Sequence, residues 1–573
     1  MKIKKYLPDI VYLAVYFILG LLTILPFFKP GFFAFHDDVQ VSRFYEMGQA
    51  LISGQFPVRW VGDLGYGFGY PIFNFYSVLP YYIGGFINVF GADALIAAKT
   101  VFVIGILLSG LSMFFLIKEF FGRLPALVAS IAYLYFPYHA VNIYVRGDLA
   151  ELFAYAILPL VFLGLLKIHY SKANLIPKAA IIILSLSLFA LIISHNLSAL
   201  MMGIFITIFV VVSLVATKNK EIYKWYLISF LIAFLLSAFY TIPVLFEMKY
   251  TNVLSQVGIG GGSNYKDHFL CINQLWNSPW GFGGSTKGCI ADGLSFRLGK
   301  IYILLTLISI ALAGFYFKKI KDKAMILFIS IAFLLFSIFM TLEVSGIIWS
   351  IPYMNFLQFP WRFLNFAGLF MATLIGISVY LIEKVSKKEI YTIVAGLMVI
   401  GIIFFNAKLF APQEYLNREA SYYTNKYYLN WTASKISDEY LPKNFKKPTN
   451  SHDVWNYPFE AILPNGNLPL PNKLVTKTPT DLVATTNLAN NFGVVAKTPY
   501  FPAWNIYIDG KKVNYKIKNG EMYFSLPAGP HKIEIRFEQT RIELLGDLLT
   551  VIGVVAISIV IINKSKFYGR KTS

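Results

Sequence analysis

Residues 179–217 read AAIIILSLSLFALIISHNLSALMMGIFITIFVVVSLVAT. A helix needs roughly 20 apolar residues to cross a hydrocarbon core about 30 Å thick, and this run holds about two such lengths. Near its middle stand Ser194, His195 and Asn196, a turn-prone and ionisable triplet that would be costly at the centre of a bilayer. The run therefore predicts two membrane-spanning helices joined by a short turn at one membrane face.

The composition of the whole chain indicates that such helices dominate the fold. Of the 573 residues, 57% are hydrophobic, 17% aromatic and 14% charged, whereas ordinary globular proteins carry about 25% charged residues. This argues against a conventional soluble enzyme, and we expect an α-helical polytopic membrane protein. Apolar runs predict about twelve spans, near residues 9–28, 97–117, 122–138, 150–166, 179–195, 197–217, 225–246, 300–317, 324–342, 363–382, 390–409 and 546–563.

The basic residues decide the orientation of these spans. The apolar stretch 76–90 could be a thirteenth span, and counting it would invert every span that follows it. If this stretch lies in the outer interface instead, 22 of the 50 Lys and Arg residues fall in inner segments, as the positive-inside rule requires. We therefore expect a multi-pass protein of the cell membrane with both termini in the cytoplasm. The net charge of +20 is then a topology signal and indicates no nucleic-acid partner.

The N-terminus begins MKIKK and continues into an apolar run, as a signal peptide would. The run ends at Lys29-Pro30-Gly31 without a small-x-small cleavage site, so we expect a retained anchor.

Three outer segments are long enough to carry function: residues 29–96, 247–299 and 410–545. We expect a transmembrane domain over 1–409 that includes the first two segments, and a β-rich extracytoplasmic domain over 410–545. A final transmembrane helix and a basic cytoplasmic tail follow over 546–573.

The second half of the third outer segment alternates in strand fashion. Asp509-Gly510 and Asn519-Gly520 are two-residue hairpin signals between alternating runs. They predict a small antiparallel β-sandwich, a module that is more often structural or acceptor-binding than catalytic.

Both cysteines, Cys271 and Cys289, lie in the second outer segment. They form either a disulfide, which would stabilise the loop by about 3 kcal/mol, or two free thiols, and the sequence leaves both open. Without nearby His at ligand spacing they do not make a zinc site. The chain contains no G-x-x-x-x-G-K-[ST] motif, which excludes P-loop ATP-driven transport.

The first outer segment predicts a short helix on the outer membrane surface that begins after His36, Asp37 and Asp38. Its apolar residues fall on one face at helical spacing. The two acids are then either helix caps favoured by the helix dipole, or a general base or metal ligand at the membrane boundary. Both can hold at once, because two neighbouring acids can divide the roles.

Other polar residues converge on the same outer level. Ionisable groups at a membrane boundary are functional candidates, with helix capping and interface anchoring as the alternative for each. The arginine fork binds phosphate oxygens through paired hydrogen bonds, and the phosphate most common at this level is that of a lipid. With His36 and the two acids, the candidates for binding substrate are Arg59, His139, Arg146, Asp148, Glu151, His195 and Arg362.

Several short motifs occur in an order that resembles known membrane families. They are FHDD at 35–38, GYGFGYPIFNFYS at 65–77, RGDLAE at 146–151, SHN at 194–196, FPWRF at 359–363, DEYLP at 438–442, and YFPAWNIYIDG and LPAGPHKIEIRF near the C-terminus. The early acids and interfacial helix resemble the GT-C superfamily of polyprenol-dependent glycosyltransferases. More closely, the set resembles a bacterial membrane family labelled 6-pyruvoyl-tetrahydropterin synthase-related, and its C-terminal part resembles YfhO-type proteins.

The GT-C resemblance implies inverting transfer of a sugar from a polyprenyl-phosphate donor to a polysaccharide, glycolipid or protein acceptor outside the membrane. It places the general base, or part of a site for a divalent cation such as Mg²⁺ or Mn²⁺, at Asp37 or Asp38. Metal dependence stays open, because some GT-C enzymes need a divalent cation and others do not; the second D-x-D or D-x-E motif of the metal-dependent branch is not evident, which weakens the case for a metal. Nothing in the sequence supports the soluble zinc chemistry of a pterin synthase.

The resulting hypothesis places the donor phosphate near Arg59, Arg146 and Arg362, while Asp37 or Asp38 deprotonates an acceptor hydroxyl. Two alternatives remain: a transporter or flippase of a lipid-linked precursor, and a non-catalytic scaffold for envelope assembly. A cavity that contains one of the acids and an arginine favours the transferase, whereas a path continuous to the cytoplasm favours transport.

Overall fold

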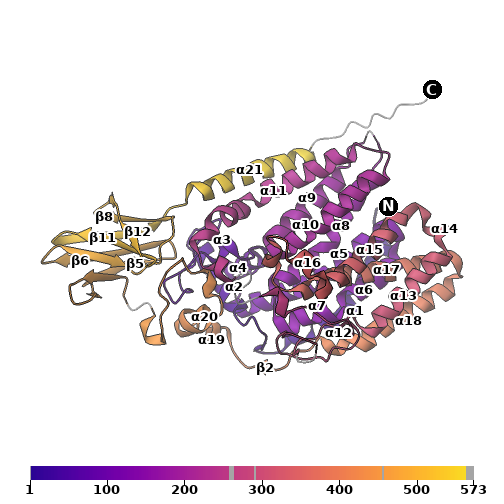
Figure 1. Ribbon diagram of the computed structural model, residues 1–573, viewed down its shortest axis with the longest axis horizontal. Helices are drawn as coiled ribbons and strands as arrows, with labels where there is room; N and C mark the ends of the chain where they lie inside the picture. Colours follow the sequence, from indigo (N-terminus) through magenta and orange to yellow (C-terminus); the bar gives the residue numbers. More distant parts are fainter. Residues whose placement is uncertain (1, 174, 257–263, 290–291, 455–456, 563–573) are drawn as a thin grey trace.

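The computed structural model describes residues 2–173, 175–256, 264–289, 292–454 and 457–562. The protein is a helical bundle with two β-sheets at one end (Figure 1). The basic tail expected after the last helix lies outside the described residues.

Among the described residues, eight helices are long and apolar enough to cross a membrane, or nine if a pair bent by 45° counts as one span. Three shorter apolar helices cover the other predicted runs, so twelve spans stay a prediction. The long helices are α5 (Ala94–Phe121), α8 (Leu149–His169), α10 (Asn196–Ala216), α11 (Ile222–Glu247), α15 (Ala324–Thr341), α17 (Leu364–Val385), α18 (Lys388–Asn406) and α21 (Arg541–Ile562). The bent pair is α6 (Arg123–Leu134) with α7 (Pro137–Val141) and the π-helix Asn142–Arg146; the shorter helices are α1 (Lys2–Gly20), α9 (Lys178–Ser194) and α13 (Lys300–Phe315).

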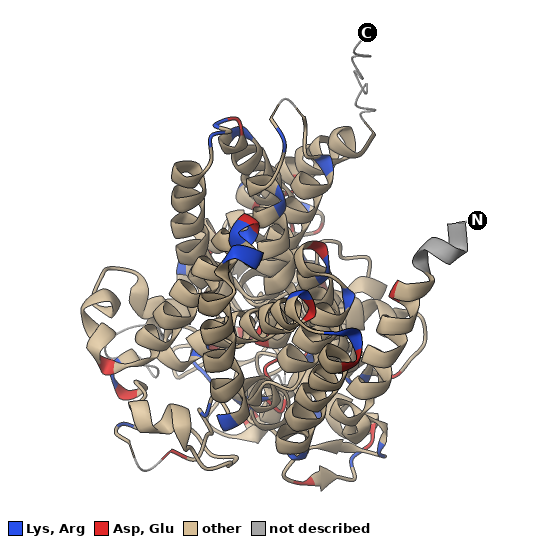
Figure 2. Ribbon diagram, turned by 90° about the vertical axis from the view of Figure 1, so that its right-hand side faces the viewer, with Lys and Arg blue, Asp and Glu red and all other residues tan. Residues whose placement is uncertain are grey.

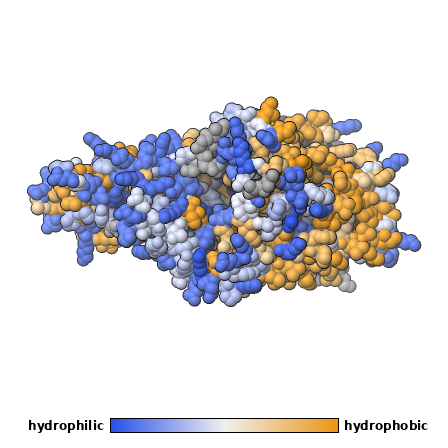
Figure 3. Space-filling view, turned by 60° about the horizontal axis from the view of Figure 1, so that its bottom comes forward, coloured by the Kyte–Doolittle hydropathy of each residue, from blue (hydrophilic) through white to orange (hydrophobic). Residues whose placement is uncertain are grey.

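Burial separates the central helices from the peripheral ones. In the most apolar stretch of α8 and of α17, 94% of the residues are buried inside the protein, whereas in that of α21 only 17% are. The surface over the bundle is predominantly apolar and the surface over the sheets hydrophilic (Figure 3). Figure 2 looks onto the end of the bundle away from the sheets and shows Lys and Arg on its loops.

The long apolar run 179–217 breaks where the polar triplet predicts. Helix α9 ends at Ser194 and α10 begins at Asn196, with His195 between them in an extended conformation. His195 is therefore held at a helix junction.

Two short helices form the outer layer of the bundle next to the sheets. The predicted interfacial helix is α2 (Gln40–Ile52), and the stretch 76–90 forms α4 (Leu79–Val89), which is too short to cross a membrane. The two pack closely, since a Cβ on Gly84 would lie 2.0 Å from the Phe44 ring. The apolar face of α2 is thus covered by α4, whereas the sequence predicts that it lies on the membrane surface.

The C-terminal strands form two five-stranded antiparallel sheets, in the orders β10-β11-β7-β3-β4 and β5-β6-β12-β8-β9. Both predicted hairpins occur: Asp509-Gly510 joins β8 to β9, and Asn519-Gly520 joins β10 to β11, all four with positive φ. The strands are β3 (Phe459–Ile462), β4 (Leu468–Pro469), β5 (Lys473–Lys477), β6 (Asp481–Leu488), β7 (Phe492–Ala496), β8 (Trp504–Ile508), β9 (Lys511–Val513), β10 (Lys516–Lys518), β11 (Glu521–Leu526) and β12 (Gly529–Phe537).

The segment 410–454, expected to belong to the β-rich domain, instead runs along the bundle. Its strand β2 (Tyr415–Leu416) pairs with β1 (Phe32–Phe33) of the first outer segment. Its helix α19 (Ala420–Thr424) packs against α2. The third outer segment therefore contributes two units, one on the bundle and one in the sheets.

The last helix returns from the sheets to the bundle and lies along α11 (Figure 1). Its glycines allow this approach, because a Cβ on Gly546 or Gly553 would lie 2.7 Å from the backbone of α11. Small residues at a helix contact are a common means of close packing in membranes.

Candidate functional site

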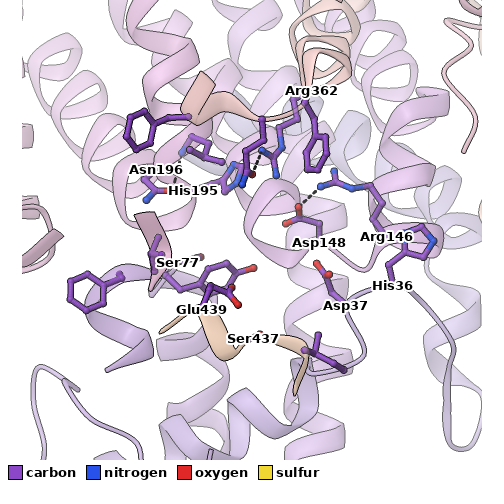
Figure 4. Close-up of a pocket in the computed structure, with 18 of the residues that line it drawn as sticks. His36, Asp37, Ser77, Arg146, Asp148, His195, Asn196, Arg362, Ser437 and Glu439 are labelled. Carbon is purple, nitrogen blue, oxygen red and sulfur yellow. Dashed lines mark hydrogen bonds and ion pairs between the residues drawn. The ribbon is translucent and has the colours of Figure 1, made fainter. Parts of the chain in front are cut away.

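A cavity of about 540 Å³ lies between one set of ends of the central helices and the layer formed by α2 and 410–454. Six separate parts of the chain supply its charged and imidazole side chains, and Figure 4 shows the carboxylates of Asp37, Asp148 and Glu439 facing a common space. The charged and imidazole side chains that line it are His36, Asp37, Arg43, Arg146, Asp148, His195, His268, Arg362 and Glu439.

The backbone holds Asp37 at this cavity. The amide of His36 donates to the carbonyl of Val145, and the amide of Asp37 donates to the carbonyl of Arg146, both at 3.0 Å. Burial and the neighbouring charge of Asp148 raise the pKa of Asp37 to about 6. This carboxyl group is therefore a base of useful strength near neutral pH.

Asp38 faces away from the cavity. Its carboxylate accepts a hydrogen bond from Arg418 at 3.3 Å, and its carbonyl accepts one from the Tyr428 hydroxyl at 2.8 Å. Burial raises the pKa of Asp38 to about 6 as well, against the opposing charge of Arg418. The two neighbouring acids thus have different environments, and of the pair only Asp37 lines the cavity.

The RGDLAE motif forms one wall. Arg146 pairs with Asp148 at 2.6 Å and with Glu151 at 2.7 Å, and its guanidinium lies 4.7 Å from the Trp361 ring centroid. Gly147 between them has φ +63°, and a Cβ there would lie 2.2 Å from the Phe35 ring. The motif therefore needs glycine for both its conformation and its packing.

Glu151 lies beneath the cavity and is fully buried. Its carboxylate accepts hydrogen bonds from Arg146, from Arg362 at 3.3 Å and from Asn365 at 2.6 Å. Arg362 also donates to Gln358 at 3.1 Å. The two arginines are thus largely compensated by two acids, so they supply directed donors with little excess charge.

Arg43, on α2, is a site residue that sequence reasoning missed. Its side chain is 4% exposed, it donates to the Tyr81 hydroxyl at 3.2 Å and to the Ser437 hydroxyl, and it lies over the Tyr76 ring at 4.4 Å. Within the described part of the chain it has no ion-pair partner, and its Nε has no hydrogen-bond partner. Asp37, Gln40 and Arg43 follow one another at intervals of three residues. This spacing is the sequence signal that could place Arg43 on the same side of the chain as Asp37.

Glu439 was noticed only as part of the DEYLP motif. It belongs to the segment 410–454 and lines the cavity opposite Arg362 (Figure 4). Burial raises its pKa to about 7, while the charge of Arg43 opposes the shift. No local sequence pattern indicates that this segment returns to the bundle.

Two histidines predicted from the sequence as candidates also line the cavity. His36 Nε2 is 2.8 Å from the carbonyl oxygen of Phe282, and His195 Nδ1 is 2.7 Å from the Ser198 hydroxyl. Both side chains are fixed by these contacts and can orient a bound group.

Two predicted residues lie elsewhere. His139 is fully buried, with its ring stacked on Tyr155 at 4.5 Å. Arg59 is bound to Asp547 at 2.6 Å, Asn74 at 3.0 Å and the Phe239 carbonyl at 2.7 Å. Neither lines the cavity. The sequence predicts only how deep in the membrane each residue lies, and it does not predict the direction in which the side chain points.

The second outer segment covers part of the cavity. Cys271 and Cys289 form a disulfide. The loop that it closes carries Ser285, whose hydroxyl lies 2.8 Å from Nδ1 of His268, just before the loop, and accepts a hydrogen bond from Trp361 at 3.3 Å. The disulfide thereby holds a cavity wall against the helix that carries Arg362.

A divalent cation does not fit the described acids. Asp38 faces away from Asp37, and the Asp148 carboxylate is bound to Arg146. Among the residues that the structure describes, no group of three or more His, Cys, Asp or Glu side chains could hold a metal ion.

Comparison with known proteins finds one matching family model and several solved structures of similar fold. Residues 73–256 match the model of a family described as 6-pyruvoyl-tetrahydropterin synthase related domain, membrane protein. This match confirms the resemblance to that membrane family for this part of the chain. No curated protein sequence matches.

Three solved structures are similar in fold. Arabinofuranosyltransferase AftD from Mycobacteria matches with a TM-score of 0.44 and 12% identity over 71% of this chain, which spans 27% of that protein. ArnT from Cupriavidus metallidurans bound to undecaprenyl phosphate matches at 0.34 and 11%, over 77% of this chain and 78% of that one. The Archaeoglobus fulgidus oligosaccharyltransferase with zinc and sulfate matches at 0.37 and 14%, over 78% and 59%. With TM-scores below 0.5, these likenesses add no weight to a functional assignment.

Proposed function

We propose that the protein is a membrane glycosyltransferase that moves a sugar from a polyprenyl-phosphate donor to an acceptor hydroxyl on the outer face of the membrane. The observation that carries this is the cavity that brings Asp37 together with three arginines, Arg43, Arg146 and Arg362. A base and a set of phosphate-binding donors are the two parts that such a transfer requires.

In the proposed reaction, Asp37 takes the proton of the acceptor hydroxyl. The acceptor oxygen attacks the anomeric carbon from the face opposite the phosphate, and the bond between this carbon and the phosphate oxygen breaks. The sugar is transferred with inversion, and the polyprenyl phosphate leaves with one more negative charge. Asp37 later releases its proton to water.

Arg43 is the arginine best suited to that added charge. Arg146 and Arg362 already share Asp148 and Glu151, whereas Arg43 contacts hydroxyl groups and an aromatic face. A buried guanidinium without an anionic partner is costly, and a donor phosphate would supply that partner. We therefore assign Arg43 the place that Arg59 held in the sequence-based hypothesis.

The alternatives receive less support. The cavity is lined by helix ends and connecting segments that the sequence predicts on the outer face, which suits an outward-facing transferase better than a transport path. A scaffold would not need an acid with a pKa near 6 beside three arginines.

The decisive experiment is transfer by the purified full chain in nanodiscs, with radiolabelled polyprenyl-phosphate sugars as donors and a cell-envelope fraction as acceptor. We expect label in the acceptor fraction with the wild type and at least about a hundredfold less with Asp37→Asn. Asp38→Asn is the matched control, since Asp38 has a similar pKa and lies outside the cavity. Equal transfer by wild type and Asp37→Asn would exclude this mechanism.

A further inference from the structure

A second cavity, of about 380 Å³, lies at the base of the sheets and outside the site described above. Glu460 of β3 and Glu521 of β11 stand on its sheet side. Phe68 from the first outer segment and residues 445–449 stand on its bundle side. The cavity is therefore formed where the C-terminal sheets meet the bundle.

One short stretch of chain connects the two cavities. Glu439 and Tyr440 line the first cavity, and Phe445 and Lys447 line the second. The five residue-to-residue steps from Tyr440 to Phe445 span at most about 18 Å of extended chain. An extended molecule of a few nanometres could therefore occupy both cavities at once.

This connection is held in place by side-chain contacts. Asp438, next to Glu439, pairs with Lys447 at 2.7 Å and accepts a hydrogen bond from the Tyr66 hydroxyl at 3.2 Å. The Phe68 and Phe445 rings meet edge to face at 5.4 Å. The stretch of chain between the two cavities is thus held in place by these contacts.

The charges that line the second cavity balance one another. Three lysines and three carboxylates line it. Lys497 pairs with Glu521 at 2.6 Å and with Glu460 at 3.6 Å, and Lys447 is paired with Asp438. A site with this balance gives no excess attraction to a polyanion such as a phosphate-linked polymer.

What remains for a ligand is a set of hydrogen-bonding groups beside an aromatic ring. Burial and the Glu460 carboxylate raise the pKa of the nearby Tyr457 hydroxyl, and Asn467 donates to the same carboxylate at 3.1 Å. Both side chains line the cavity. Fixed carboxylate and amide groups suit the many hydroxyls of a sugar, and concave sites with a few oriented polar groups are typical of ligand binding.

We propose that this second cavity binds a neutral oligosaccharide segment of the acceptor, remote from the hydroxyl that reacts. Its role in transfer rests on the proposed function, whereas the binding itself does not. The acceptor is accordingly a glycan chain whose end enters the first cavity while an earlier part lies against the sheets.

The test measures binding of neutral and anionic glycans to the full chain in nanodiscs by isothermal titration calorimetry, without donor. The neutral probes are maltoheptaose and cellohexaose, and the anionic probe is a polygalacturonate heptamer. The test variant is Tyr457→Ala with Asn467→Ala, which removes both side chains on Glu460. The control is Tyr507→Ala with Asn505→Ala, because these two hold Glu538 in the same way, at 2.6 and 2.9 Å, outside the cavity.

We expect at least one neutral probe to bind the wild type, with at least tenfold weaker binding in the test variant and less than a twofold change in the control. Three results would overturn the proposal: no binding of either neutral probe, equal weakening in both double variants, or tighter binding of the anionic probe. Because no donor is present, none of these results depends on sugar transfer, and failure of the proposed function would appear only in the radiolabel assay.

Discussion

The main-chain amide of Asp37 donates a hydrogen bond of 3.0 Å to the main-chain carbonyl of Arg146. The segment that carries the candidate base and the segment that carries Arg146, a second residue lining the cavity, are thus joined through backbone atoms. Side-chain substitution at either position leaves this bond intact, so the chemistry of each side chain can be tested separately from its position.

Asp37→Asn should lower sugar transfer by about 10²–10⁴-fold, the usual contribution of a general base. Asp38→Asn should lower it much less, because Asp38 faces Arg418. Initial rates at saturating donor measure both. A larger loss in Asp38→Asn than in Asp37→Asn would reverse the assignment.

The pH dependence should follow the ionisation of Asp37. Burial holds its pKa at about 6, above the ordinary value of 3.8, and the base must be ionised to accept a proton. We therefore expect kcat/KM to be constant above this pH and to fall about tenfold per pH unit below it.

Two variants identify the group responsible for this pH limb. The charge of Arg43 lowers the pKa of Asp37, so Arg43→Gln should move the limb to higher pH and Arg43→Lys should restore it. Glu439, whose pKa is about 7, titrates in the same range. A limb that survives in Glu439→Gln belongs to Asp37, and its disappearance there would assign it to Glu439.

Glu151→Ala should destabilise the fold by about 3–5 kcal/mol, because it removes a buried carboxylate shared by Arg146 and Arg362. Asp9→Asn is the comparison, since Asp9 pairs with the more exposed Lys118 and Arg123 and should cost less than about 1 kcal/mol. Thermal unfolding in detergent measures both. Similar melting temperatures for the two variants would contradict a buried ion network beneath the cavity.

Arg59 should act on stability and leave the chemistry unchanged. A double-mutant cycle with Arg59→Ala and Asp547→Ala should show a coupling energy of about 1–3 kcal/mol, because the two side chains meet at 2.6 Å. Transfer per folded molecule should stay within threefold of the wild type. A specific rise in KM for the donor would return Arg59 to the binding site.

Replacing Cys271 and Cys289 together by Ser should loosen the loop that carries Ser285, the hydrogen-bonding partner of His268. The chain-entropy model gives about 3 kcal/mol for a loop of this size. We expect faster proteolysis within this loop and a higher KM, with kcat less affected. Unchanged proteolysis and KM would show that the loop is held by its other contacts.

The sequence predicts what depends on local pattern. Apolar length locates the helices, the polar triplet at Ser194 locates a break between α9 and α10, and the dipeptide Asn519-Gly520 locates a hairpin. The level of a residue in the membrane also follows from the position of its span.

Local sequence pattern does not predict the direction in which a side chain points, nor which distant segments fold back onto one another. Asp37 and Asp38 are neighbours of the same type, and only contacts with Arg418 and Tyr428 turn one of them away. Glu439 reaches the cavity because 410–454 folds back over α2, about 400 residues earlier in the chain. Such pairings are set by packing between distant segments.

The sheets are held to the bundle from two sides, by the segment 410–454 before them and by α21 after them. A module mounted in this way has no single hinge about which to swing. A polymer that grows at the first cavity would therefore have to slide past the second cavity while that cavity stays in place. The distance between the second cavity and the reacting end of the polymer would then be the same for every sugar added.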